Sequence, residues 1–392
     1  MSSSVTVLGS DNSMITLSFD SSSTFTLARQ LADLINTSVT GGANYITAFD
    51  SVPAPALPRG YVGGYYQQQT NFSLMPSGYV VDLVKTPGAA FVQSSDKANQ
   101  IIMSDENTAL TFVAAAGSGT VVAGGAASHL FVAQEASGSW NLNTGTGDDV
   151  IQALGSGNDT VNAGLGNNLI VLGSGSDFVA ATGNDSIIAL GKSATINASG
   201  AHSTQVSGGR SDLIFVGGMG GATIDGGSGS DTYLGAAAVG AEQVVRGGSA
   251  GKNLLIAGNG PATLFGGGNK DELYAIGSAA QVLRAADGNE TLSAAGSTGS
   301  TTLAGGSGHT VLVAGQGSTT FEFIQGMKGQ DVVQGLTSFS NFTIHLTNYQ
   351  PSEVTQALAT QKSQHGSTTI SLSDGTKVTF ENISHLTRSD FS

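Results

Sequence analysis

Oxygen-bearing side chains recur at short, regular intervals between residues 144 and 187, and their types and spacing favour binding of a hard cation. Each follows a Gly-x-Gly-x sequence, complete or lacking one glycine, and lies two positions before an apolar residue. Carboxylate and amide oxygens are ligands that calcium prefers. The chain has no cysteine, so thiolate metal sites are excluded. The sequence therefore predicts calcium-binding turns with the candidate ligands Asp149, Asp159, Asn168, Asp177 and Asp185.

The steps between these residues are ten, nine, nine and eight, a short period that is typical of stacked repeats. One glycine-rich turn and one short strand make half of a flattened coil. Two such units close one coil, and strands of successive coils pair at about 4.8 Å. We therefore predict an all-β fold, a parallel β-solenoid or β-roll of degenerate nonapeptide repeats.

Turns that are two units apart share one edge of such a solenoid. This places Asp159 over Asp177, and it places Asp149, Asn168 and Asp185 in the opposite stack. The Asp159/Asp177 pair is the best calcium candidate, and the Asp149/Asn168 pair is next.

Repeats beyond residue 187 keep the apolar position and lose most of the acids. The most complete copy, Gly226–Tyr233, carries Asp231, which we retain as a metal candidate, and Asp212 and Asp271 mark two other copies. For these three acids we favour a carboxylate that caps its own turn through hydrogen bonds. Calcium should therefore concentrate in residues 144–187. The acid is replaced by Ala222, Asn253, Ala262, Glu290, Thr310 and Thr319. The inward apolar residues are expected to be Ile151, Val161, Ile170, Val179, Ile187, Ile214, Ile224, Tyr233, Leu255, Leu264, Leu273, Leu292, Leu312 and Phe321.

The Gly-Gly-x-Gly-x-Asp-x-apolar pattern resembles the nonapeptides of the RTX family of secreted proteins. The resemblance implies a calcium-bound parallel β-roll, export by a type I secretion system and an uncleaved C-terminal signal. The ending Leu386–Ser392 and the Ser371–Thr376 turn look like the tails of RTX-type proteins from acetic-acid and related alphaproteobacteria. Missing acids indicate partial calcium occupancy.

Changes in composition and residue pattern divide the chain into a cap or docking domain at 1–116, glycine-rich repeats at 117–334 and a C-terminal region at 335–392. Short strands are expected at Val5–Leu8 and Met14–Phe19, and the 3.6-residue periodicity of Phe25–Val39 predicts a helix. Alternating residues around Asp374-Gly375 predict a hairpin over Thr368–Phe380.

The segment Val52–Pro76 contains four of the seven prolines and a cluster of aromatic residues, so we predict an irregular loop. It either packs as a flap on the first strands or forms a contact surface for a neighbouring subunit or a sugar, because tyrosine suits half-wet interfaces. The candidate interface residues are Tyr61, Tyr65, Tyr66 and Phe72.

Charge and motifs exclude several function classes. The net charge of −14 leaves no basic stripe for nucleic acid, and no apolar run is long enough for membrane insertion. The N-terminus lacks the features of a signal peptide, so export would use another route. The six histidines show no His-Glu-x-x-His spacing, and no convincing nucleophile elbow is present. We therefore expect no enzyme activity.

The resulting hypothesis is a secreted structural protein, extracellular or on the cell surface, that assembles with itself as a fibre, surface layer or biofilm matrix and is partly stabilised by calcium. The alternative is an adhesin or carbohydrate-binding module that contacts cell-surface polysaccharide. A polysaccharide lyase or epimerase and an ice-binding protein are less favoured. An ice-binding protein would use outward rows of Thr and Ser. Such rows are also expected for a purely structural reason, because these residues pair well across strands.

Overall fold

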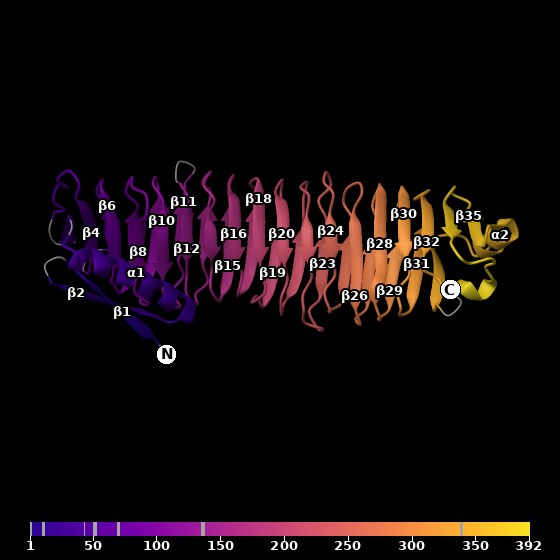
Figure 1. The fold of residues 1–392 in the computed structure, drawn as a ribbon, viewed down its shortest axis with the longest axis horizontal. Coiled ribbons are helices and arrows are strands. Elements are labelled where there is room, and N and C mark those ends of the chain that lie inside the picture. Colours follow the sequence, from indigo (N-terminus) through magenta and orange to yellow (C-terminus); the bar gives the residue numbers. More distant parts are fainter. Residues whose placement is uncertain are drawn as a thin grey trace. The chain divides into compact units, whose positions relative to one another are not determined.

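The protein was analysed as a computed structural model, which describes residues 2–9, 12–42, 44–49, 53–68, 71–134, 138–337 and 340–392. The chain divides into two compact units, Met1–Asn197 and Ala198–Ser392. In each unit, short strands of successive coils lie side by side (Figure 1). The fold is all-β and mostly parallel, as the sequence predicts, with two α-helices among the described residues.

Unit 1 contains two parallel sheets that alternate along the chain. Sheet I is formed by β3 (Tyr45–Phe49), β4 (Val62–Gln67), β6 (Tyr79–Val84), β8 (Gln100–Ser104), β10 (Gly119–Ala123), β12 (Trp140–Asn143), β14 (Thr160–Asn162), β16 (Ser176–Ala180) and β18 (Ser193–Asn197). Sheet II is formed by β5 (Phe72–Leu74), β7 (Gly88–Gln93), β9 (Thr108–Ala114), β11 (Leu130–Ala133), β13 (Val150–Ala153), β15 (Asn167–Leu172) and β17 (Asn184–Ala189).

The strand register places like residues above one another. In sheet II, Ile151 pairs with Ile170, which pairs with Ile187, and all three side chains are buried. Because successive side chains of a strand alternate between its faces, the residue two positions earlier also points inward. The inward apolar column and the acidic turn position therefore belong to the same face of each strand.

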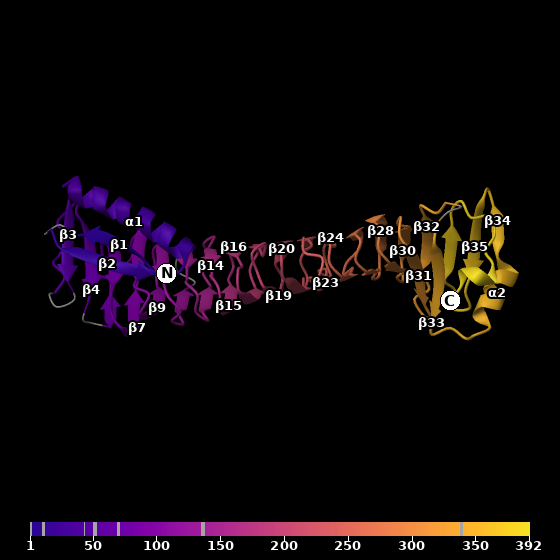
Figure 2. The same ribbon diagram turned by 90° about the horizontal axis from the view of Figure 1, so that it is seen from below.

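The outer face of sheet I is covered by the N-terminal segment of unit 1. Strands β1 (Ser3–Leu8) and β2 (Met14–Phe19) form an antiparallel pair, and α1 (Ser22–Thr40) lies along the outside of the strands (Figure 2). The Ser21 hydroxyl caps α1 by accepting a hydrogen bond from the Thr24 amide. The apolar sides of β1, β2 and α1 pack with Val81, Leu83 and Met103 of sheet I in one core. Both strands and the helix were expected from the sequence.

Unit 2 repeats the two-sheet arrangement. Sheet III is formed by β20 (Asp212–Val216), β22 (Thr232–Leu234), β24 (Leu254–Ile256), β26 (Glu272–Gly277), β28 (Asn289–Ser297), β30 (His309–Val313), β32 (Gln330–Gln334), β36 (Lys377–Phe380), β35 (Ser367–Ser371) and β34 (Lys362–Gln364). Sheet IV is formed by β19 (Ser203–Ser207), β21 (Gly221–Asp225), β23 (Gln243–Arg246), β25 (Ala262–Phe265), β27 (Gln281–Arg284), β29 (Thr301–Ala304), β31 (Thr319–Ile324) and β33 (Phe342–Thr347).

The last coil of unit 2 is closed by the C-terminal segment. The predicted hairpin is present as antiparallel β35 and β36, and α2 (Glu353–Thr360) packs beside it. The Glu353 carboxylate accepts hydrogen bonds from the amide and hydroxyl of Ser373. After the short 3-10 helix η1 (Arg388–Asp390), Phe391 forms a parallel bridge to Ile344 of β33. The tail of the chain is thus docked against the edge of sheet IV.

One expectation about the first half of the chain is wrong. The segment Val52–Pro76 is not a single irregular loop, because it contains β4 and β5; residues 52, 69 and 70 lie outside the described set. Parallel pairing of strands begins at Tyr45, well before Gly117, although the turns there match the glycine-rich repeat pattern poorly. The division into domains at 1–116, 117–334 and 335–392 stays a prediction.

One inward position is also displaced by one residue. Ile214 is 47% exposed, while its neighbours Leu213 and Phe215 are buried. Phe215, not Ile214, pairs with the inward Tyr233. Because the side-chain period is two, a slip of one residue exchanges the inner and outer faces. The other thirteen predicted inward residues are buried.

Candidate metal centre

The acidic positions of unit 1 form an inward stack that we call the inner ladder. In the stack beside sheet II, Asp149 Oδ1 accepts the His129 amide at 2.7 Å, and Asn168 Oδ1 accepts the Asp149 amide at 3.0 Å. Asn168 Nδ2 then donates to Asp185 Oδ1 at 2.7 Å. Asp149 and Asn168 therefore each cap the aligned backbone amide of the preceding coil, and Asp185 accepts from the side chain of Asn168.

The opposite stack follows the same rule. Asp159 Oδ1 accepts the Trp140 amide at 2.7 Å, and Asp177 Oδ1 accepts the Asp159 amide at 2.9 Å. Asp159 and Asp177 are aligned on adjacent coils, because Thr160 pairs with Phe178. The structure thus brings together the residues of both predicted stacks. Their role as metal ligands stays a prediction.

A second, exposed ladder runs along the residue that precedes each inward acid. Asp148 Oδ1 accepts the Asn167 amide at 2.7 Å, and Asn158 Oδ1 accepts the Ser176 amide at 3.0 Å. These acceptors serve the following coil, whereas the inner ladder serves the preceding one. The turns are therefore held to one another in both directions by oxygen atoms.

Burial perturbs the carboxylates of the inner ladder. Burial raises the pKa of Asp149 to about 7, opposed by the His129 amide and reinforced by the charges of Asp148 and Asp20. It raises the pKa of Asp159 to about 6, opposed by the Trp140 amide and reinforced by Asp177. The pKa of Asp177 is raised by the same cause.

Two of these carboxylates keep one oxygen without a hydrogen bond. Asp149 Oδ2 and Asp159 Oδ2 are buried and have no partner. The Thr144 hydroxyl lies beside Asp149 but donates to the Ala163 carbonyl. Among the described residues, ion pairs join Lys97 to Asp96, Lys252 to Glu272 and Arg284 to Glu322, and none involves an inner-ladder acid of unit 1. A buried charge without a partner is costly, so these oxygens are open to a cation.

The oxygens around the turns fit calcium. A Cβ placed on Gly175 would collide with the Gly157 carbonyl oxygen and lie close to Asp177 Oδ1. Glycine thus permits close approach of adjacent turns, which brings a carbonyl oxygen and a carboxylate oxygen to the same edge of the coil, and oxygen ligands of both kinds suit calcium. No group of three or more acidic or histidine side chains gathers around one point in the described part of the chain. Carboxylates and main-chain carbonyls together would hold the ion.

The later acids behave as hydrogen-bonding caps. Asp271 Oδ2 accepts the amides of Gly267 and Gly268 in its own turn, at 2.7 and 2.9 Å. Asp231 Oδ2 accepts the Gly248 amide of the next coil, and its Oδ1 accepts the Leu213 amide of the preceding coil. Asp231 therefore caps its neighbours rather than its own turn.

Asp212 differs from both, because it occupies the exposed ladder and accepts the Ser230 amide at 2.8 Å. The inward position of that coil, aligned with Asp231, is occupied by Leu213, in keeping with the one-residue displacement at Ile214.

Several ionisable residues of the stacks were missed by the sequence interpretation. Asp331 is 3% exposed, and burial raises its pKa to about 7. Its Gly329-x-Asp331-x-Val333 sequence carried the same signal as the earlier repeats. Asp20 was not identifiable from any spacing, because it reaches from the end of β2 to the Gly125 amide at 2.9 Å. Only tertiary packing brings it to the turns.

The four aromatic candidates do not form one surface. Tyr66 is fully buried and its hydroxyl donates to the Leu8 carbonyl, so its assignment to an interface is wrong. Tyr65 is half-buried in β4, whereas Tyr61 and Phe72 are 41% and 58% exposed. Phe72 stacks on Phe91 within sheet II at 5.2 Å between ring centroids. The expected contact role remains a prediction only for the exposed residues.

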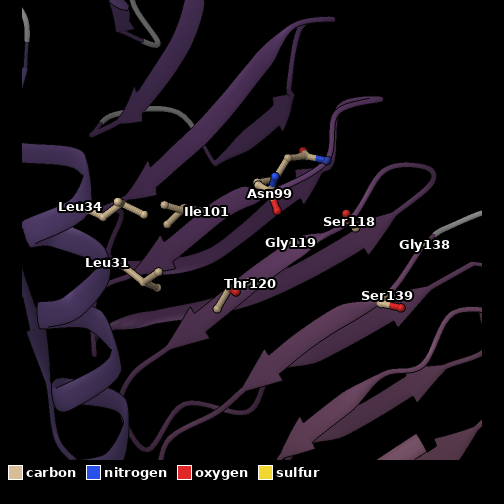
Figure 3. A pocket seen from close by; sticks show the side chains of 10 residues that line it. Leu31, Leu34, Asn99, Ile101, Ser118, Gly119, Thr120, Gly138 and Ser139 are labelled. Carbon is tan, nitrogen blue, oxygen red and sulfur yellow. The ribbon is translucent and has the colours of Figure 1, made fainter. Parts of the chain in front are cut away.

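A groove of about 550 Å³ opens between α1 and sheet I in unit 1. Figure 3 shows Leu31 and Leu34 reaching from the helix toward Ile101, with Thr120 and Ser139 on the strands beyond. Among the residues that the structure describes, those lining the groove are apolar or neutral polar. These residues offer hydrogen bonds and apolar contact.

Outward Thr and Ser residues are divided between the sheets. In sheet IV the row alternates, since Thr223 pairs with Val244, which pairs with Thr263. The row continues through Val282 to Thr302, which is followed by Thr320 and Thr343 in the same register. Threonine therefore alternates with valine from β21 to β29 and is continuous only over β29, β31 and β33 of sheet IV.

The parallel coils and oxygen-lined turns define a β-solenoid repeat protein. Residues 143–179, 154–188 and 247–275 match the family model of the RTX calcium-binding nonapeptide repeat, so the chain carries repeats of this family. The resemblance to RTX repeats is thereby confirmed, and the repeats indicate calcium as the bound ion. The third match shows that calcium-type repeats are not confined to residues 144–187, while the most complete copy, Gly226–Tyr233, lies outside all three matches.

Comparison with curated proteins and with solved structures gave no match. The similarity to alphaproteobacterial proteins therefore stays a prediction. Proteins with RTX repeats are typically secreted, and the repeats are typically structural or toxin-like. Among the described residues, no helix has the length and apolar character needed to span a membrane.

Proposed function

We propose that this protein is a non-enzymatic, extracellular or surface-bound structural protein whose coils are stabilised by calcium and which assembles with further copies of itself. The observation that carries the calcium part is the inner ladder of unit 1. Asp149 and Asp159 each bury a carboxylate oxygen that has neither a hydrogen bond nor a cationic partner. Calcium neutralises that charge and links adjacent turns.

The open edge of sheet II supports self-assembly. Among the described residues, β5 pairs only with β7, and its side chains Phe72 and Leu74 are 58% and 54% exposed. An unpaired strand edge is a template for another strand. A parallel ladder offers the same geometry to the next strand that it offers within the coil, so a second copy is a suitable partner. Head-to-tail contacts of this kind produce open filaments.

Sedimentation and electron microscopy of the purified chain, with calcium and with a chelator, test both parts. We expect assemblies in calcium and smaller, less stable species after chelation. The double variant Phe72→Lys/Leu74→Lys places charge on the open edge and should prevent assembly without loss of calcium binding. Met219, which is 71% exposed and lies outside the strands, supplies the matched control Met219→Lys. Monomers of the wild type at high calcium concentration would contradict assembly.

A second candidate function is binding of an uncharged glycan in the groove beside α1. The apolar side chains of Leu31 and Leu34, together with the neutral polar side chains along the groove, favour this function. Deleting Tyr61–Phe72 would remove β4, so a sharper test fills the groove with Thr120→Trp. Retention on polysaccharide columns should fall for this variant and persist for Thr223→Trp, a matched change at an exposed position in unit 2.

A further inference from the structure

The strand β33 at the end of sheet IV has one edge that pairs with no other strand in the part of the chain that the structure describes. On its other edge, the carbonyls of Asn341 and Thr347 accept amides of the preceding strand segment at β31. Backbone groups of a strand alternate between its two edges, so those of Phe342, Ile344 and Leu346 point away from β31. A row of this kind is a template for a further strand.

The tail of the chain occupies only the middle of this edge. Phe391 forms a parallel bridge to Ile344, and the Ser392 amide donates to the Ile344 carbonyl at 3.1 Å. His345 Nδ1 and Ser392 Oγ lie 3.1 Å apart beside the bridge. Among the described residues, no backbone group of the tail pairs with the residues on either side, Phe342 and Leu346. The tail therefore covers the edge with a single bridge.

The tail is anchored at Leu386, and the turn beyond this anchor satisfies its own polar groups. Gln361 Oε1 accepts the Leu386 amide at 3.0 Å, and Gln361 Nε2 donates to the Leu386 carbonyl at 3.1 Å. The Leu386 side chain is fully buried. After it, the amide and hydroxyl of Thr387 donate to the Asp390 carboxylate. The turn can therefore leave β33 without breaking these hydrogen bonds, while Leu386 stays in place.

The strand β5 of sheet II has an open edge that is complementary to this one. The Asn71 carbonyl accepts an amide of β7, and the Met75 amide donates to a carbonyl of β7. The backbone groups of Phe72 and Leu74 therefore point to the open edge. Sheets II and IV are both parallel ladders, so β5 of a second copy can continue sheet IV beyond β33 in the same hydrogen-bond pattern.

We propose that the open edge of β33 is the surface on which a second copy docks through β5, and that Phe391 and Ser392 must release Ile344 before docking occurs. This docking rests on the self-assembly proposed above, for which it names the second surface and its regulation. A tail on the same chain competes at an effective concentration on the order of millimolar. The tail therefore raises the protein concentration that assembly requires, and it shields the edge of the isolated chain from other strands.

A reversible lock on the tail tests the proposal, because the chain contains no cysteine of its own. In the double variant His345→Cys/Ser392→Cys, the new thiols replace side chains that are already in contact, and oxidation joins them across the edge of β33. Mass spectrometry and non-reducing electrophoresis identify the chains in which the disulfide lies within one molecule. Sedimentation in calcium should show that these chains stay monomeric at concentrations where the reduced variant assembles. The single variant Ser392→Cys cannot form the lock and should assemble in both conditions.

A deletion of residues 388–392 supplies the opposite change, because it opens the edge in every molecule and keeps the Leu386 anchor. When the tail leaves the edge open in a tenth of the molecules or fewer, the deletion should lower the concentration required for assembly by about tenfold or more. Adding Phe72→Lys/Leu74→Lys to the deletion should abolish that gain, because it removes the docking strand. The melting temperature in calcium verifies that the shortened chain remains folded.

The outcomes separate this docking from the proposed function. Equal assembly of the locked and reduced forms, or an unchanged threshold after the deletion, would overturn docking at β33 and leave self-assembly through another surface in place. If the wild type, the reduced variant and the deletion all stay monomeric in calcium, then self-assembly itself is wrong, and the docking falls with it.

Discussion

The inward acidic position has the same place in both units but different partners. In unit 1, Oδ1 of Asp159 and Oδ1 of Asp177 each accept a hydrogen bond from an amide of the preceding coil, rather than from an amide of their own turn. In unit 2, Glu290 caps its own turn at the Ala286 amide, and Thr310 does the same at Gly306 with a longer contact of 3.5 Å. The position therefore accepts hydrogen bonds from different amides without requiring a charge, and Ala222 and Ala262 occupy it with no side-chain acceptor at all.

This difference separates the structural role of the acids from their chemical role. Asn253 replaces an acid in unit 2 and still accepts the Asp231 amide at 2.9 Å, as Asn168 does for Asp149 in unit 1. An amide is thus sufficient for the ladder, and it avoids the cost of burying a charge. At Asp149 and Asp159, whose second oxygen has no hydrogen bond, the proposed calcium would supply a reason for the charge.

The largest effect should come from substituting the acid with the most hydrogen bonds. In Asp271→Asn, the new amide group cannot accept from the Gly267 and Gly268 amides, so two buried donors lose their acceptor. We expect the free energy of unfolding in chelator to fall by about 4 kcal/mol. Asp177→Asn should cost less than about 1 kcal/mol, because one acceptor oxygen suffices there. Urea unfolding of both variants measures the contrast, and equal losses would remove the distinction between the two units.

A pH effect follows from Asp331, whose pKa is raised by burial from an ordinary 3.8 to about 7. Between these values the folded state holds a proton that the unfolded chain has released. The contribution to stability is complete below about pH 3.8 and is lost as the pH rises through 7. Asp331→Asn should therefore be more stable than the wild type at pH 8 in chelator, by on the order of 3 kcal/mol.

The advantage of Asp331→Asn should become small near pH 4, where the unfolded wild type also begins to carry the proton. Urea unfolding of both proteins at pH 4, 6 and 8 measures how the difference in their free energies of unfolding changes with pH. A constant difference between the variant and the wild type would show that Asp331 does not titrate in this range.

Removal of calcium should act mainly through the carboxylates of the inner ladder. One site at a calcium concentration 100 times its Kd contributes about 2.7 kcal/mol. The double variant Asp159→Asn/Asp177→Asn keeps the acceptor ladder, because Asn168 already performs that function in the other stack. We expect the variant to lose most of one site's calcium-dependent increase in melting temperature while its stability in chelator is maintained. A full calcium response in the variant would assign the ions to other turns.

The fold could largely be predicted from the sequence because its determinants are local and periodic. Residues such as Ile151, Ile170 and Ile187 stack as their spacing requires. The prediction failed at Ile214, because the acid from which the phase was judged, Asp212, lies on the outer face of its strand. It also failed in β4 and β5, where prolines and aromatics concealed the strands.

The candidate site was predictable in its residues but not in its hydrogen bonds. Spacing placed Asp159 over Asp177. It could not reveal that each carboxylate caps an amide of the preceding coil, because that depends on which backbone groups remain unpaired at the start of a strand. Asp20 escaped notice, and Glu290 was counted as a loss of the repeat acid, for a related reason: the hydrogen bonds of both depend on how far the side chain reaches.

The smallest effect should come from adding a charge to the ladder of unit 1. Asn168→Asp replaces the donor to Asp185 Oδ1, now at 2.7 Å, with a second carboxylate, and it creates an acid pair like that of Asp271 and Glu290. In chelator we expect a loss of about 1 kcal/mol, from the missing hydrogen bond and the repulsion of like charges. In calcium the loss should be reversed, because the new carboxylate adds a ligand between two coils. Thermal unfolding in both conditions decides the matter: a loss that calcium does not restore would mean that charge is tolerated in these turns without being used.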